Sequence, residues 1–285
     1  MTSFDALYAY VPREQRDALK AFRENHPLQY LTVAGTEWTY HTAGTGEDTI
    51  LWLVGGLKKA DAAYKSIPQL ADHYRIIAPD YPALGTMQAL ADGLAALLKV
   101  EDVQRVYVLA GSFGGMLAQV FMRHYPAMIE KVVLSTTSPP NPSHAERYQQ
   151  LLDMATIAPD ALLAETAQSQ MFGTIAPADE EAEFYRAYLK ELYENRLTKT
   201  DIVTIYQAIL DYMGKAFSDS DLSDWDGEIL IINSDNDATF GESVQDNLVN
   251  LYPTAQVHTF KGAGHSPAST QREAFFKTVK TFFTR

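Results

Sequence analysis

Hydrophobic positions along this chain follow two different periods. Short, uninterrupted apolar runs are typical of strands buried on both faces of a parallel sheet, whereas apolar residues at every third or fourth position predict helices. The alternation of the two predicts an α/β fold, an open and mostly parallel sheet with helices on both faces. The strand-like runs cover residues 49–57, 74–85, 106–111, 131–136, 228–234 and 255–260, and helical segments at 62–73, 87–100, 114–125, 242–252 and 271–285 lie between most of them.

The N-terminal part adds one helix and two strands to this pattern. Residues 3–25 have a helical pattern, and LQYLTV (28–33) and EWTYHTA (37–43) alternate as strands do. The glycines of AGTGED (43–48) are typical of a hairpin turn. We therefore expect a helix that packs on the core and two antiparallel strands at the edge of the sheet.

One interval, roughly 143–217, contains several helical patterns with no strand between them. We therefore predict a core formed by residues 1–140 and 219–285, with an all-helical cap at 141–218 inserted into it. Large side chains of this interval either line a pocket or form the packing core of the cap. They are Met171, Phe184, Tyr185, Tyr188, Tyr193, Tyr206 and Tyr212.

The charge of the chain excludes one class of partners. The 285 residues include 23 Lys and Arg against 36 Asp and Glu, a net charge of -13 that repels phosphate backbones and anionic lipid headgroups. We expect a small-molecule substrate, no nucleic-acid partner, and a monomer or homodimer.

The N-terminal residues have no basic start followed by an apolar run, and no segment approaches the roughly 18 apolar residues of a membrane span. We predict a cytoplasmic protein.

Metal and thiol chemistry are not indicated by the sequence. The chain has no cysteine, which excludes disulfides, thiolate nucleophiles and Cys-ligated metals. The acidic stretches NSDND and SDSDLSDWDG lack the Gly at the sixth and the Glu at the twelfth position of a calcium loop. We expect no metal and no cofactor.

Ser112 is the candidate nucleophile. It lies in Ala110-Gly111-Ser112-Phe113-Gly114, a relaxed match to GxSxG, the pattern that places a serine on a strained strand-to-helix turn. The pattern by itself arises often by chance. The strand-like VYVLA before it and the helical GGMLAQVFMRHY after it favour a nucleophile over a residue that only permits close packing.

A serine nucleophile needs a base and an acid that orients the base. His265 follows the last predicted strand in the glycine-flanked loop FKGAGHSP, and the other six histidines fit structural positions. Asp237 stands three residues after Ser234, the end of a strand, which favours it over Asp235. The order Ser112, Asp237, His265 is the one such a serine requires. The alternative for the two aspartates is a solvated turn.

Backbone N–H groups are the expected stabilisers of the oxyanion. Phe113, directly after the nucleophile, supplies one of them. The second comes from the loop after the strand at 49–54, where Gly55 and Gly56 let the chain approach the serine. We select the N–H of Leu57, with that of Gly56 as the alternative, although VGG also fits a plain end of a strand.

Five motifs, VGGL, APDYPALG, LAGSFGG, INSDND and GAGHSP, resemble those of the α/β-hydrolase superfamily over nearly the whole chain. The resemblance implies the α/β-hydrolase fold with an inserted helical cap. Residues 81–121 are also similar to a region of maspardin and related bacterial hydrolases. Two departures matter: Gly55 replaces the histidine usual before the oxyanion glycine, and a Ser nucleophile separates the chain from haloalkane dehalogenases and epoxide hydrolases.

The leading hypothesis is a serine hydrolase that cleaves a small to medium, largely apolar carboxylic ester through an acyl-enzyme intermediate. A C–C bond hydrolase or lyase would use the same triad. The similarity to maspardin also raises a non-catalytic binding protein. Because competent residues occupy all three triad positions, we favour an enzyme.

Overall fold

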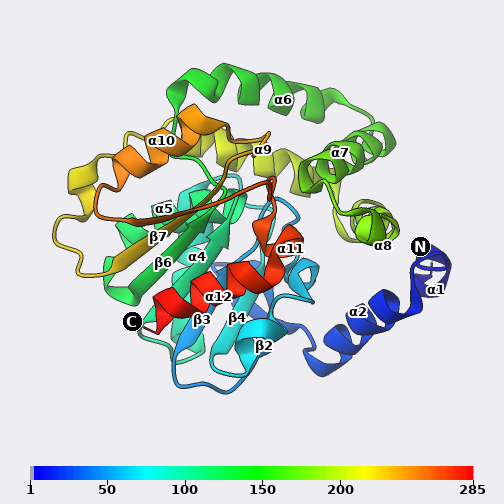
Figure 1. The fold of residues 1–285 in the computed structure, drawn as a ribbon. Coiled ribbons are helices and arrows are strands. Elements are labelled where there is room, and N and C mark those ends of the chain that lie inside the picture. Colours follow the sequence, from blue (N-terminus) through cyan, green and yellow to red (C-terminus); the bar gives the residue numbers. More distant parts are fainter. Residues whose placement is uncertain (1–2, 285) are drawn as a thin grey trace.

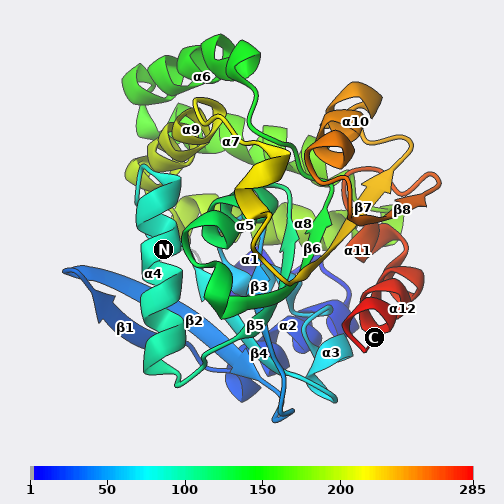
Figure 2. The same ribbon diagram turned by 90° about the vertical axis from the view of Figure 1, so that its left-hand side faces the viewer.

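The computed structural model describes residues 3–284, which contain one eight-stranded sheet with helices on both faces (Figures 1 and 2). The strands lie in the order β1-β2-β4-β3-β5-β6-β7-β8. The pairs β1–β2 and β2–β4 are antiparallel, and the remaining pairs are parallel. The strands are β1 (Gln29–Val33), β2 (Thr36–Ala43), β3 (Thr49–Leu53), β4 (Arg75–Asp80), β5 (Val106–Gly111), β6 (Ile129–Ser135), β7 (Glu228–Ser234) and β8 (Gln256–Phe260).

Helices pack on both faces of this sheet. On one face, Phe276 and Phe283 of α12 contact Trp52 and Tyr107 of the sheet, with ring centroids 5.9 and 5.0 Å apart. Figure 2 shows α4 and α5 on the opposite side from α12. The helices are α1 (Phe4–Leu7), α2 (Arg13–Asn25), α3 (Pro68–Ala71), α4 (Met87–Val100), α5 (Phe113–His124), α6 (Ala145–Ile157), α7 (Asp160–Ile175), α8 (Asp179–Glu191), α9 (Lys199–Met213), α10 (Glu242–Leu251), α11 (Pro267–Thr270) and α12 (Arg272–Phe283), with 3₁₀ turns η1 (Ala60–Ala63), η2 (Pro126–Met128), η3 (Pro142–His144) and η5 (Asp219–Leu222), and the π-helical turn η4 (Leu192–Arg196).

The central strands are buried as the uninterrupted apolar runs predict. All five residues of β3 are buried, as are the last five of β4 and the last six of β7. The edge strand β8 has only one buried residue, Phe260. The predicted α/β fold is therefore confirmed, and every parallel strand was anticipated from its hydrophobic run.

The predicted hairpin at 43–48 is wrong. β2 pairs with β1 and β4, so residues 43–48 connect two strands that are not neighbours, and the tight turn lies at Ala34–Gly35 instead. Glycine is required at positions 44 and 46 because this segment packs closely against residues 73–74. A Cβ on Gly44 would lie 2.2 Å from the Tyr74 carbonyl oxygen, and one on Gly46 would lie 2.1 Å from that of His73.

Two predicted helices are interrupted, and in both a proline marks the interruption. The helix expected at 3–25 consists of α1 and α2, because Pro12 occupies the N-cap of α2. The helix expected at 62–73 is reduced to η1 and α3, which starts at Pro68. Proline lacks the N–H that would continue a helix through these points.

Helices alone occupy the chain between η3 and η5, and Figure 1 shows α6 to α9 lying together beyond one end of the strands. We call this part the α6–α9 segment. It contacts the core through α9, which packs against α4, and it contacts the N-terminus through α8, which packs against α1.

Within residues 3–284, no helix is both long and apolar enough to cross a membrane.

A buried ionic cluster around Asp61 joins the N-terminal helix, the core and the α6–α9 segment. Asp61 lies in η1 and is 1% exposed. It accepts hydrogen bonds from Arg23 Nε of α2 (2.8 Å), from Arg196 Nη1 of η4 (2.8 and 3.0 Å) and from Tyr188 Oη of α8 (2.7 Å). Burial alone would raise the pKa of Asp61, but Arg196 and Arg23 outweigh it and lower this pKa to about 2.

We expect Asp61→Asn to lower the free energy of unfolding at pH 7 by about 3 kcal/mol, because the partly buried guanidinium group of Arg196 loses its counter-charge and that of Arg23 keeps only Glu191. The folded-state pKa lies below the unfolded one, so the stabilisation by Asp61 is complete above pH 4 and is lost as the pH falls toward 2. Urea unfolding between pH 7 and pH 3 measures both effects. Asp17→Asn is the control, because Asp17 pairs with Arg13 while its side chain is 51% exposed. Equal losses in the two variants would contradict the prediction.

Candidate active site

Ser112 occupies a sharp turn between β5 and α5. Its backbone angles are φ 50° and ψ -122°, a conformation that side chains other than glycine seldom adopt. Hydrogen bonds on both sides hold it there: its N–H donates to Ser135 O (3.0 Å), and its carbonyl oxygen accepts from Thr137 Oγ1 (2.8 Å). The Ser112 hydroxyl does not cap α5. It is therefore available to a partner across the cavity.

The small residues around Ser112 are required where the chain packs most closely. A Cβ on Gly114 would lie 2.2 Å from Leu53 O, and one on Gly115 would lie 2.6 Å from the Thr137 side chain. Gly111 has more space, with its nearest such contact at 3.6 Å. The crowding that favours glycine therefore lies after the serine, where α5 packs against the end of β3.

The segment Asp235-Asn236-Asp237 after β7 holds the loop that carries His265. Asp235 Oδ1 accepts from Gly262 N (2.8 Å), and Asn236 Oδ1 accepts from Gly264 N (2.7 Å). Both glycines have positive φ, 66° and 63°, which favours glycine at these positions. Two side chains thus fix the loop by its backbone, and the third is left to contact the histidine.

Ser112, His265 and Asp237 lie in hydrogen-bonding contact. His265 Nε2 is 3.1 Å from Ser112 Oγ, and Nδ1 is 3.0 Å from each carboxylate oxygen of Asp237. The Asp237 side chain is fully buried, and its Oδ1 also accepts from the backbone N–H groups of Thr239 and Phe240. Of the two aspartates weighed in the sequence, the structure brings Asp237 to the histidine and places Asp235 on Gly262.

The predicted oxyanion donors line the same cavity as Ser112. Within residues 3–284, the N–H groups of Gly56, Leu57 and Phe113 donate to no protein acceptor. Phe113 is the first residue of α5, so its N–H belongs to the positive end of that helix. A Cβ on Gly55 would lie 3.4 Å from Ser112 Cβ, so the loop passes directly beside the serine.

Lys58 anchors the loop that follows β3. It has φ 61° and is 2% exposed, and its Nζ lies 3.0 Å from Asp201 Oδ1 of α9. Burial lowers the pKa of Lys58, and Asp201 offsets part of this effect. The Asp201 carboxylate also completes a capping box with Thr198 at the start of α9. The loop that carries the predicted oxyanion donor Leu57, and its alternative Gly56, is therefore tied to the α6–α9 segment.

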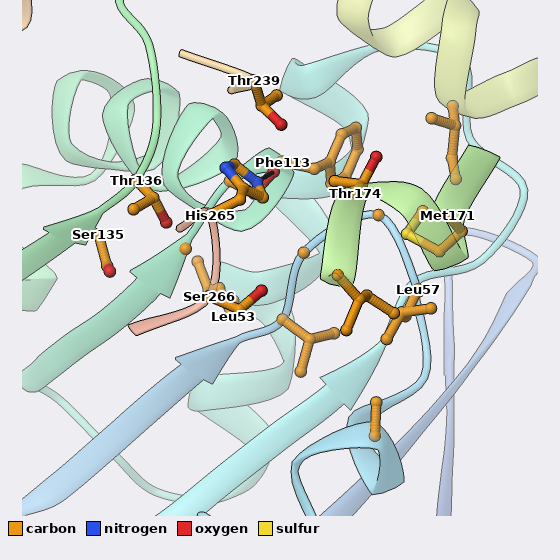
Figure 3. A pocket seen from close by; sticks show the side chains of 18 of the residues that line it. Leu53, Leu57, Phe113, Ser135, Thr136, Met171, Thr174, Thr239, His265 and Ser266 are labelled. Carbon is orange, nitrogen blue, oxygen red and sulfur yellow. Dashed lines mark hydrogen bonds between the residues drawn. The ribbon is translucent and has the colours of Figure 1, made fainter. Parts of the chain in front are cut away.

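A cavity of about 410 Å³ opens onto Ser112 and His265 (Figure 3). The α6–α9 segment forms one wall, and the loops after β3, β5, β6, β7 and β8 form most of the other. Among the described residues that line it there is no Lys, Arg, Asp or Glu. Burial raises the pKa of the lining residues Tyr148, Tyr185 and Tyr206, which stay neutral at physiological pH. The cavity wall therefore carries no carboxylate, ammonium or guanidinium group.

The two expectations for the large side chains of the helical interval are each met in part. Met171, Tyr185, Tyr193 and Tyr206 line the cavity. Phe184, Tyr188 and Tyr212 are buried and take no part in its wall.

Sequence reasoning missed much of the cavity wall. Tyr148 of α6 lines it, as do Ser135 and Thr136 at the end of β6. The hydroxyl-rich run STTS directly after a buried strand was the only signal for the last two. Thr136 has φ 41°, an outlier for a β-branched residue and a sign of a constrained position.

Comparison with known proteins gives the family. The sequence model described as "Alpha/beta hydrolase family" matches residues 44–278. The chain therefore belongs to the alpha/beta hydrolase family.

The chain is similar in sequence to curated proteins and in fold to solved structures. A 2-hydroxy-6-oxo-2,4-heptadienoate hydrolase of Pseudomonas putida is 24% identical over 87% of this chain and 93% of its own length. An uncharacterized Mycobacterium tuberculosis protein is 28% identical over 42% of this chain, which spans only 38% of that protein. The crystal structure of a hydrolase from Pseudomonas aeruginosa superposes with a TM-score of 0.78 at 20% identity, covering 91% of this chain and 99% of the other.

Proposed function

We propose that this protein is a serine hydrolase of small to medium, uncharged carboxylic esters. The observation that carries the proposal is the uncharged cavity of about 410 Å³ that opens onto Ser112, His265 and the unused backbone donors. An ester with an apolar acyl group can enter such a cavity without leaving a charge unpaired, whereas a charged group would lose its hydration there without compensation.

In the proposed first step, Ser112 Oγ attacks the ester carbonyl carbon while His265 Nε2 takes the hydroxyl proton. Asp237 keeps the other proton of the ring on Nδ1 and stabilises the imidazolium. The oxyanion accepts hydrogen bonds from Phe113 N–H and from the Leu57 or Gly56 N–H. The C–O bond to the leaving group then breaks, His265 donates its proton to the leaving oxygen, and an alcohol and an acyl-serine result.

In the second step, water replaces the alcohol. His265 takes a proton from the water, whose oxygen attacks the acyl carbon, and the second oxyanion uses the same donors. The bond to Ser112 Oγ breaks, and His265 returns the proton to that oxygen. The products are the carboxylic acid and the free enzyme.

The domain division is part of the same proposal. Residues 141–218 would act as a cap over a core of 1–140 and 219–285, because α7 and α9 supply much of the wall that faces Ser112. The cap would then select the acyl group by shape and exclude water from the acyl-enzyme.

A second candidate is a C–C bond hydrolase or lyase that uses the same triad, and the similarity to the Pseudomonas putida hydrolase favours it. The substrate in that protein's name carries a carboxylate. The wall described above offers no Lys or Arg to a carboxylate, which supports the ester over the dienoate.

Matched substrates test the proposal. 4-Nitrophenyl butyrate and 4-nitrophenyl hemisuccinate have acyl chains of equal length, but only the second bears a carboxylate. We expect kcat/KM to be at least about tenfold higher for the butyrate, because the charge is desolvated without a partner. A 2-hydroxy-6-oxo-dienoate is assayed beside them, and a fluorophosphonate probe tests covalent labelling of Ser112.

Faster turnover of the dienoate than of the butyrate would replace the ester hydrolase by the C–C hydrolase. The absence of both turnover and labelling in folded protein would indicate a non-catalytic binding protein instead.

A further inference from the structure

Four hydroxyl side chains surround His265 in the cavity wall: Ser135, Thr136, Thr239 and Ser266 (Figure 3). None of the four hydroxyl groups has a hydrogen-bond partner among residues 3–284. Ser135 and Thr136 are each only 5% exposed, Ser266 is half-buried, and Thr239 is exposed. The Ser135 and Thr136 hydroxyl oxygens are not fully buried although their residues are, so both are open to the cavity, and this side of it can hydrogen-bond a polar ligand.

The four hydroxyl residues are held in place by hydrogen bonds and chain connections to the residues of the candidate triad. Ser135 O accepts from Ser112 N, and Thr137 Oγ1 donates to Ser112 O, so Thr136 stands between two residues bonded to the nucleophile. Its own N–H donates to Ile232 O (2.8 Å), which holds the positive φ. The other two residues are held beside His265: Thr239 N–H donates to Asp237 Oδ1, and Ser266 follows His265 in the chain.

The opposite side of the cavity has a different character. Figure 3 shows Leu57 and Met171 there, together with Thr174. The Thr174 hydroxyl donates to Gln170 O in its own helix (3.1 Å), so it is already satisfied. The part of the wall around Leu57 and Met171 is therefore mainly apolar, while the phenol groups of Tyr148, Tyr193 and Tyr206 line other parts of the α6–α9 side.

The proposed reaction determines which side of the cavity holds the leaving group of an ester and which side holds its acyl group. His265 Nε2 must reach the leaving oxygen, because it donates the proton to it. The carbonyl oxygen must point to Phe113 and to the loop of Leu57. The leaving group then lies on the hydroxyl side beside His265, and the acyl chain lies along Leu57 and Met171.

We propose that the leaving group is an alcohol with further hydroxyl groups, such as the glycerol of a monoacylglycerol, and that Thr136 and Ser266 determine this specificity. The inference rests on the proposed ester hydrolase function. The unpaired hydroxyls would bind the free hydroxyls of a polyol, whereas a simple alkyl alcohol leaves them unsatisfied.

Glycerol monobutyrate and propyl butyrate test the inference, because they share the acyl group and the length of the alcohol carbon chain. Titration of released butyrate gives kcat/KM for each. We expect about a tenfold preference for the glycerol ester, the effect of one or two hydrogen bonds. Thr136→Val keeps a β-branched side chain and removes the hydroxyl group of Thr136, and Ser266→Ala removes that of Ser266. In each variant, the ratio of kcat/KM for glycerol monobutyrate to kcat/KM for propyl butyrate should fall toward 1.

Thr204→Val is the control, since Thr204 is a buried threonine outside the cavity whose hydroxyl donates to Thr200 O in its own helix. Its ratio should match that of the unmodified protein. Equal hydrolysis of the two esters by the unmodified protein would overturn the inference and leave the ester hydrolase intact. A preference that persists in both variants would overturn the assignment to Thr136 and Ser266. Hydrolysis of neither ester would overturn the proposed function as well.

Discussion

Ser112→Ala is expected to lower kcat for 4-nitrophenyl butyrate by about 10⁴-fold or more, the loss typical of a removed nucleophile. The variant keeps the hydrogen bonds of the turn, because Ser135 and Thr137 contact only the backbone of Ser112. Folding should therefore be unchanged. Steady-state kinetics at pH 8, with urea unfolding of the same preparation, separates the loss of turnover from a loss of structure.

Ser112→Gly sharpens this test. The angles φ 50° and ψ -122° cost a non-glycine residue about 1–3 kcal/mol, and glycine avoids most of that cost. We expect this variant to be inactive and at least as stable as the unmodified protein. A catalytic turn that stores strain has this signature, whereas a turn that only serves packing would show no loss of turnover.

Ser138→Ala is the matched control for Ser112→Ala. Ser138 is 3% exposed and follows the end of β6, the strand next to β5, but it does not line the cavity. Its carbonyl oxygen, which accepts from Gln119 and Tyr212, stays in place. Turnover within about twofold of the unmodified protein is expected for it. Activity retained in Ser112→Ala would contradict the proposed nucleophile.

The hydrophobic runs predicted the central parallel strands correctly because burial on both faces leaves a signal in each run by itself, whereas the edge strand β8, with one buried residue, was predicted from its β-branched and aromatic residues. The order of the strands has no such local signal. Gly44 and Gly46 illustrate the difference: the segment around them has the composition of a turn, but the contacts that require glycine come from Tyr74 and His73, about 30 residues away. A sequence pattern indicates local conformation, whereas these glycines are required by residues distant in the chain.

The same distinction applies to the candidate site. Ser112, Asp237 and His265 could be predicted because each follows a recognisable strand, and parallel strands bring their carboxyl ends to one edge. Thr136 could not, because its significance lies in a positive φ and an unpaired hydroxyl, neither of which a sequence displays. The charge-free cavity wall likewise depends on which faces of α7 and α9 point inward.

Asp237→Asn is the second substitution with a large expected effect, a loss of about 10⁴-fold in kcat. An asparagine can still accept from the N–H groups of Thr239 and Phe240 through its amide oxygen. Its NH₂ group would then face His265 Nδ1 and donate to it, which places the ring proton on Nε2. A ring protonated at Nε2 cannot accept the proton of Ser112, so the base is lost while the geometry persists.

Asp235→Asn is the matched control, two residues away in the same segment. Its carboxylate accepts from Gly262 N–H at 2.8 Å, and an amide oxygen can accept the same hydrogen bond. We expect kcat within about threefold of the unmodified protein, measured on 4-nitrophenyl butyrate between pH 6 and pH 9. The reverse pattern, a large loss for Asp235→Asn and a small one for Asp237→Asn, would assign the orienting acid to Asp235. Because both variants remove one negative charge from the same turn, a general effect of charge on the site would lower both rates equally, and only a specific contact with His265 separates them.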